Sequence, residues 1–173
     1  MIPSVLTLFC AVALGCTSPR PSPEDLAARH EALAQLLASA PDEATADSLV
    51  VRLAFDAEAD LDLYVTDSAH ETVYFGNSPS GTGGELLADL LCDAPAPRVE
   101  TIVFARRRRG AVRVGVDAPE RCRKGVRLVP FVVELRAGER RVEQRGVAIP
   151  GRFEVIVLEV EVDGAASVLR DPP

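Results

Sequence analysis

Apolar and polar residues alternate along much of this chain, most regularly over residues 60–65. Every second position there is apolar, from Leu61 to Val65, and the positions between them begin with Asp60 and Asp62. A period of two with one apolar side is typical of a half-buried β-strand. The stretch therefore predicts a strand whose exposed face carries two carboxylates, roughly 6–7 Å apart at the backbone.

The same alternation recurs in short segments separated by turn-forming residues. Several short strands at such spacing are typical of an all-β sandwich. Residues 86–91 fit a short strand or an extended loop. The predicted fold is mainly β: an antiparallel β-sandwich of the jelly-roll or Ig-like kind, with one N-terminal helix. We expect its other strands over 49–55, 72–75, 99–104, 111–116, 126–135, 141–144, 147–149 and 153–162.

One segment has a helical period instead. Its stripe consists of Leu26, His30, Leu33 and Leu37, and a proline four residues further on ends it. Ser22 suits the N-cap position, and the proline after it suits the first helical turn. We therefore expect this division: signal peptide 1–15, tether, helix and linker 16–47, β-sandwich domain 48–165 and tail 166–173.

Residues 1–15 are apolar and carry no charged side chain. This stretch is short for a bilayer span and fits the hydrophobic region of a signal peptide. It runs into Ala13-Leu14-Gly15-Cys16, which resembles a bacterial lipobox and makes Cys16 the candidate for lipidation. A plain secretory signal and an uncleaved membrane anchor are the alternatives. The expected location is the bacterial cell envelope, membrane-anchored and facing the periplasm or exterior; the alternative is secretion.

Cysteine usage agrees with export. If cleavage precedes Cys16, the body of the chain keeps one pair, Cys92 and Cys122. An even pair in an oxidising compartment favours a disulfide. Closing a loop of about thirty residues stabilises a fold by roughly 3–4 kcal/mol on the chain-entropy model. The alternative is two independent buried thiols.

The charges are distributed unevenly. The chain has 173 residues, enough for one domain with a sizeable core. Residues 49–103 carry ten acids and two bases, whereas residues 104–152 carry fourteen bases and five acids. We expect acidic and basic strands to neutralise one another and expect no nucleic-acid partner. The run at the predicted 106–110 turn is a solvated tip or a contact for anionic lipid head groups; it consists of Arg106, Arg107, Arg108 and Arg109.

The acidic half suggests a metal site. Ca²⁺ takes six to eight oxygen ligands and tolerates carboxylates in irregular arrangements. The alternative is that the aspartates cap a strand end, bond loop amides and pair with the arginines of 106–113. The candidate oxygen donors are Asp56, Asp60, Asp62, Asp89 and Asp93.

Catalytic patterns are weak, and we expect no enzyme. Asp60 and Asp62 could meet the spacing of a glycosidase pair, but the chain has no Trp and only two Tyr to bind a sugar. A Ser-His-Asp triad would have to use His70 in a turn, and no G-x-S-x-G motif is present. The GTGG segment at 81–84 lacks the lysine of a P-loop.

Part of the chain resembles the DUF2135 (YfaP-like) family of β-sandwich modules with an Asp-Leu-Asp-Leu strand. Leu87 and Thr101 stand where that pattern often has Asp and Asn. The resemblance implies a fold and an extracytoplasmic location, and it implies no activity. The matching segments are FDAEADLDLYVTD (55–67), VYFGN (73–77), SGTGGELLAD (80–89), VETI (99–102) and GAVRVGV (110–116).

These observations lead to an exported, lipid-anchored, non-catalytic β-sandwich protein with a binding or structural role in the envelope. Its expected partner is an envelope protein or a surface polymer, in addition to the membrane that holds its anchor. The alternative is a calcium- or glycan-binding accessory module. Calcium is the one cofactor that the residues suggest.

Overall fold

A computed structural model describes residues 21–41, 43–56, 58–96, 98–107, 109–152 and 154–162, without the side chains of 154–156. The leader 1–15, Cys16, Arg108 and the tail 166–173 lie outside the described residues. Within the described part, no helix is long and apolar enough to cross a membrane.

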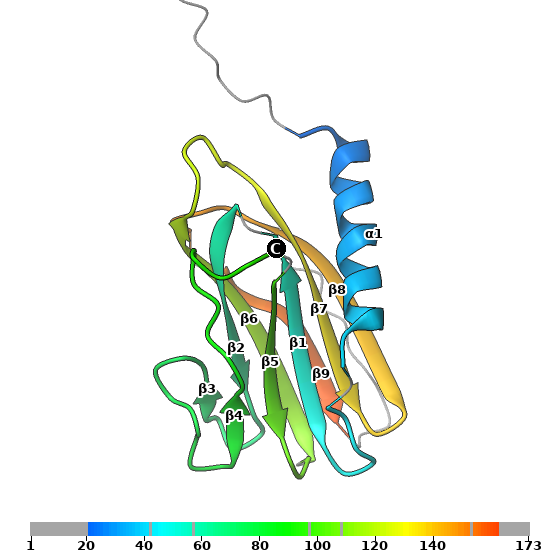
Figure 1. The fold of residues 1–173 in the computed structure, drawn as a ribbon. Coiled ribbons are helices and arrows are strands. Elements are labelled where there is room, and N and C mark those ends of the chain that lie inside the picture. The colour runs from blue at the N-terminus through cyan, green and yellow to red at the C-terminus, as the bar shows by residue number, and fades with distance from the viewer. Residues whose placement is uncertain are drawn as a thin grey trace, which may run out of the picture.

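The protein is mainly β, with two antiparallel sheets and one helix (Figure 1). The five-stranded sheet has the order β4-β5-β1-β7-β8, and the four-stranded sheet has the order β3-β2-β6-β9. The elements are α1 (Pro23–Ser39), β1 (Leu49–Phe55), β2 (Ala59–Thr66), β3 (Thr72–Val73), β4 (Gly84–Leu86), β5 (Arg98–Phe104), β6 (Gly110–Arg121), β7 (Val129–Ala137), β8 (Arg140–Ala148) and β9 (Glu154–Val162).

The inner faces of the two sheets share one apolar core. Leu61, Leu63 and Val65 of β2 are buried in it, which confirms their predicted side of the strand. Side chains of β1, β5 and β7 enter the same core from the other sheet. Because the core is made mostly of Val, Leu and Ala, its stability rests on burying many small aliphatic groups rather than a few large rings.

Several strand boundaries differ from the sequence prediction, including those of β3 and β7. β6 continues to Arg121, because its polar end pairs with β2. Only Leu86 of the ambiguous 86–91 stretch lies in a strand, and the rest is loop. Residues 141–144 and 147–149 were expected as two strands, but one strand, β8, covers most of both. Its Gly146 lies under the Phe131 ring, where an added Cβ would come within 2.2 Å of the ring, so this glycine is required for packing rather than for a turn.

Helix α1 lies on the outer face of the five-stranded sheet (Figure 1). Ser22 caps it as predicted: its hydroxyl accepts from the Asp25 backbone at 3.1 Å, and the Asp25 carboxylate accepts from Ser22 in return. Leu33 and Leu37 bury their side chains in a second, smaller apolar cluster on that outer face. The helix therefore covers apolar surface that one face of the sheet would otherwise expose.

A buried arginine joins the C-terminal end of the helix to the sheet. Arg52 of β1 donates to the carbonyls of Leu37 and Pro41, at 2.8 and 3.1 Å. It also pairs with the fully buried Glu134 of β7 at 2.5 Å. Since the last turn of α1 has no basic residue of its own, Arg52 supplies the positive charge that the helix C-terminus favours.

Candidate functional site

The two aspartates of β2 are buried, and the expectation that they lie on an exposed face is wrong. Asp60 is 6% exposed and Asp62 is 5% exposed. They alternate with the core leucines of the same strand, so they point away from the shared core. The face of β2 that carries Asp60 and Asp62 is thus buried, like the face in the core. Buried carboxylates are unusual in proteins.

Glu100 of β5 extends toward these aspartates from the other sheet. Its side chain is 1% exposed, and its carboxylate accepts from the backbone of Leu63 at 2.9 Å and of Leu90 at 3.0 Å. One carboxylate thereby connects β5, β2 and the loop that precedes β5. Glu100 was missed from the sequence because both faces of β5 carry apolar residues, so the pattern does not reveal which face is buried.

Three carboxylates from these elements meet. One oxygen each of Asp62, Asp89 and Glu100 lies within 4.8 Å of the other two. We name these three residues the carboxylate cluster. Asp62 and Glu100 are buried, whereas Asp89 is exposed on the loop. Oxygen donors at this spacing can bind a hard divalent cation.

The cluster strongly perturbs its own ionisation. The pKa of Asp62 is raised to about 7, mainly by burial and then by the neighbouring charges of Asp60, Asp89 and Asp117. Burial is also the main cause that raises the pKa of Glu100 to about 8, against the opposing effect of its two backbone hydrogen bonds. The pKa of Asp60 is raised as well, by burial and then by Asp89. These carboxylates therefore resist carrying their charges together in the absence of a cation.

The expected pairing of these aspartates with nearby arginines is not found among the described residues. Arg113 pairs instead with Glu159 of β9. In the register of β2 and β6, Asp60 faces Glu120 and Asp62 faces Asp117. Directly opposed like charges destabilise a strand pair. Asp60 and Asp62 thus face two of the five acidic residues in the otherwise basic segment 104–152.

Two predicted metal ligands lie elsewhere. Asp56 forms an ion pair at 2.7 Å with Arg29 of α1, not with the arginines of 106–113 that the alternative hypothesis named. Asp93 is exposed in the loop before β5 and is not among the three clustered carboxylates. Of the five aspartates proposed from the sequence, the structure brings Asp62 and Asp89 together, whereas Asp56 and Asp93 lie outside the carboxylate cluster.

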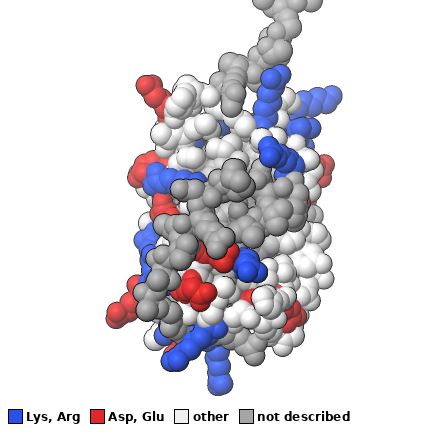
Figure 2. Space-filling view, turned by 180° about the vertical axis from the view of Figure 1, so that it is seen from behind, with Lys and Arg blue, Asp and Glu red and all other residues white. Residues whose placement is uncertain are grey.

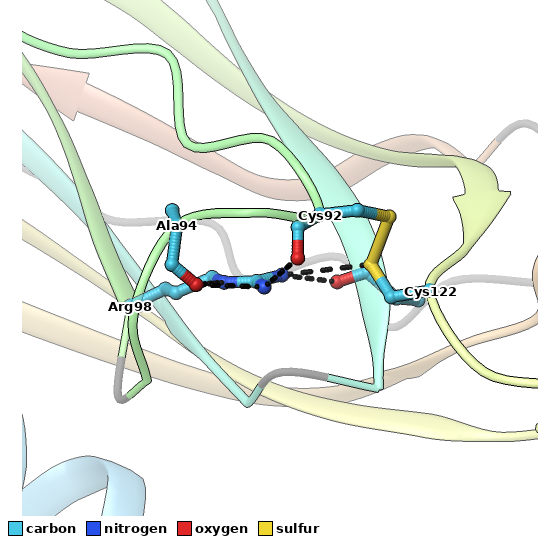
Figure 3. The surroundings of a disulfide bond; sticks show 5 residues. Cys92, Ala94, Arg98 and Cys122 are labelled. Atoms are coloured by element: carbon cyan, nitrogen blue, oxygen red, sulfur yellow. Dashed lines mark hydrogen bonds between the residues drawn. A yellow bond between two sulfur atoms is a disulfide. The ribbon is translucent and has the colours of Figure 1, made fainter.

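The predicted disulfide between Cys92 and Cys122 is confirmed, with Cα atoms 5.2 Å apart. Arg98 lies beside it (Figure 3). The guanidinium donates to the carbonyls of Cys92, Ala94 and Ala59 at 2.9 to 3.2 Å. Because these carbonyls and the Cys122 sulfur take its hydrogen bonds, Arg98 forms no ion pair with the carboxylate cluster.

The described arginines of the run at the β5–β6 turn differ in their contacts. Arg107 donates its backbone N–H to the Asp47 carbonyl at 2.7 Å and its side chain to the Ala46 carbonyl. Arg106 and Arg109 are exposed. Acidic and basic side chains are interspersed on the face seen in Figure 2. Contact of this run with an anionic surface stays a prediction.

No known protein family, curated protein or solved structure matches this chain.

Proposed function

We propose that the chain is an exported, lipid-anchored, non-catalytic β-sandwich protein of the bacterial cell envelope with a binding or structural role. The Cys92–Cys122 disulfide carries the proposal, because such bonds persist in oxidising compartments and are rare in the cytosol. The apolar leader and the lipobox-like Cys16 supply the route and the anchor. The segments that resemble DUF2135 modules imply the same location, although no known family matches the chain.

The strand order supports an Ig-like form of the sandwich rather than a jelly roll. In Ig domains one sheet has the order D-E-B-A and the other C′-C-F-G. Here β4-β5-β1 corresponds to D-E-B, and β3-β2-β6-β9 corresponds to C′-C-F-G. β7 takes the place of strand A beside β1 and runs antiparallel to it. The β7–β8 hairpin is then an insertion between the F and G equivalents.

The two histidines have different surroundings. His30 on the helix contacts the Gly146 carbonyl at 2.8 Å through its ring nitrogen. His70 is exposed in a turn. Neither forms a hydrogen bond with a serine or a cysteine within the part of the chain that the structure describes, and a nucleophile–base pair requires such a bond. An envelope protein or a surface polymer is the partner class we propose.

Substituting the lipobox cysteine tests the anchor. In the Cys16→Ala variant we expect loss of the protein from the membrane fraction or a block in its maturation, since the acyl groups have no attachment site. Cys10→Ala, also in the leader, is the matched control and should fractionate with membranes like the wild type. A Cys16→Ala variant that stays in the membrane fraction at unchanged mass would contradict lipidation.

A calcium- or glycan-binding accessory module is the second candidate, and the carboxylate cluster favours its calcium form. The glycan form has less support. The Tyr64 and Tyr74 rings stack on each other with centroids 5.1 Å apart, so each ring offers only one remaining face to a sugar.

A further inference from the structure

The cluster oxygens have the spacing of ligands on a single ion. Oxygen ligands lie about 2.3–2.6 Å from Ca²⁺, so two ligands of one ion are separated by at most about 5.2 Å. The oxygens of Asp62, Asp89 and Glu100 all lie within 4.8 Å of one another. They come from β2, β5 and the loop between β4 and β5, so an ion held by them would join three separate segments.

A second observation points to a ligand at the same place. Asp60 lies outside the three clustered residues, is 6% exposed, and has an enclosed Oδ1 with no hydrogen-bond partner. It shares a face of β2 with Asp62, and Asp89 exerts the largest charge effect on it. Asp60 therefore lies beside the cluster on the same face of β2, outside the set whose oxygens are within 4.8 Å of one another. An enclosed carboxylate oxygen without a donor is costly unless a cation or a proton satisfies it.

The charge of Arg98 lowers the pKa of Asp60, but no described basic side chain forms an ion pair with these carboxylates. The ion pairs of the described residues omit Asp60, Asp62, Asp89 and Glu100. Asp62 also receives no hydrogen bond within the described part of the chain, although it is buried. Arg98 directs its donors to backbone carbonyls. Glu100 thus has two backbone donors, whereas the enclosed Oδ1 of Asp60 has none among the described residues.

We propose that Asp62, Asp89 and Glu100 bind one Ca²⁺ ion, with Asp60 as a further oxygen donor. Ca²⁺ suits the set because it accepts six to eight oxygens in irregular geometry and takes carboxylates in one- or two-oxygen contacts. The ion offsets the like-charge pairs between β2 and β6. It also fastens the loop carrying Asp89 to both sheets, close to the end that the disulfide already holds.

Calcium titration of the full chain tests the site. The chain is stripped with EDTA, returned to 0.15 M NaCl, and melted with and without millimolar CaCl₂. At a hundredfold excess of Ca²⁺ over its Kd, we expect the Tm to rise by about 5–10 °C. Isothermal titration should give one ion per chain. Ion binding does not require lipidation, so this result and that of the Cys16→Ala experiment are independent.

Two exposed aspartates of the same loop provide the matched comparison. Asp89→Asn should abolish most of the calcium shift, whereas Asp93→Asn should retain it. Both side chains are exposed, so both variants should fold. In EDTA, Asp62→Asn should melt above the wild type, because it removes one of several repelling charges. Absence of a calcium shift in the wild type, or equal shifts in Asp89→Asn and Asp93→Asn, overturns the proposal.

Discussion

At the scale of single residues, Arg98 forms many of the hydrogen bonds that hold the segments around the disulfide together. It is 1% exposed, and its guanidinium lies 5.8 Å from the centre of the Phe55 ring. Its donors satisfy carbonyls in the loop before β5 and at the start of β2. A planar group with five donors can serve several carbonyls at once, which a lysine cannot do.

We expect Arg98→Met to lower the free energy of unfolding by about 2–4 kcal/mol, because buried carbonyls lose their donors. The shift in the midpoint of the urea unfolding curve measures this loss. Arg106→Met, at an exposed arginine of the neighbouring turn, is the control and should change stability by less than about 0.5 kcal/mol. Equal effects of the two substitutions would show that Arg98 does not hold the loop.

At the scale of elements, the carboxylate cluster joins three segments that are distant in sequence. Glu100 alone accepts hydrogen bonds from β2 and from the loop before β5. These bonds tie the five-stranded sheet to the four-stranded one where β3 leaves the first residues of β2 unpaired on one side. Because several carboxylates lie together, they repel one another when ionised, and this repulsion lowers the stability of the fold to a degree that depends on their protonation.

Without divalent cations, we expect the free energy of unfolding to fall as the pH rises from about 4 to about 8. The ordinary pKa values of Asp62 and Glu100 are 3.8 and 4.5, and in the fold they rise to about 7 and about 8. Between these limits the folded chain binds more protons than the unfolded chain, so deprotonation favours unfolding. Below this interval both states are protonated and the penalty disappears.

Urea titrations in EDTA at several pH values within this interval measure the slope. Asp62→Asn cannot ionise at that position, so its stability should fall less steeply with pH than that of the wild type. A wild-type stability that rises through the interval, or identical slopes for the two proteins, would contradict the ionisation behaviour assigned to the cluster.

At the scale of the whole molecule, local patterns predicted the elements well. Alternation found the strands because one side of each packs on a shared core, as for Leu61 and Leu63. The capped helix followed from Ser22 and the proline after it. The division into strands 141–144 and 147–149 was wrong, and Gly146 between them lies under the Phe131 ring within one continuous strand.

The candidate site was only partly predictable, because its members come together through sheet pairing. Asp62 and Asp89 could be proposed from their residue type, but Asp56 and Asp93 had equal claims until the fold placed Arg29 beside Asp56. Glu100 could be proposed only if the buried face of β5 were known, and the sequence does not reveal it. The burial of Asp60 and Asp62 depended on how elements distant in sequence assemble around β2, which no local pattern records.

The central claim is that the chain is exported, cut before Cys16, lipidated and oxidised, and intact-mass spectrometry of protein taken from cells tests it most directly. We predict a chain that begins at Cys16 and carries added acyl mass, with Cys92 and Cys122 alkylated only after reduction. A chain with its leader intact, no acyl mass and two freely alkylated thiols would contradict the account.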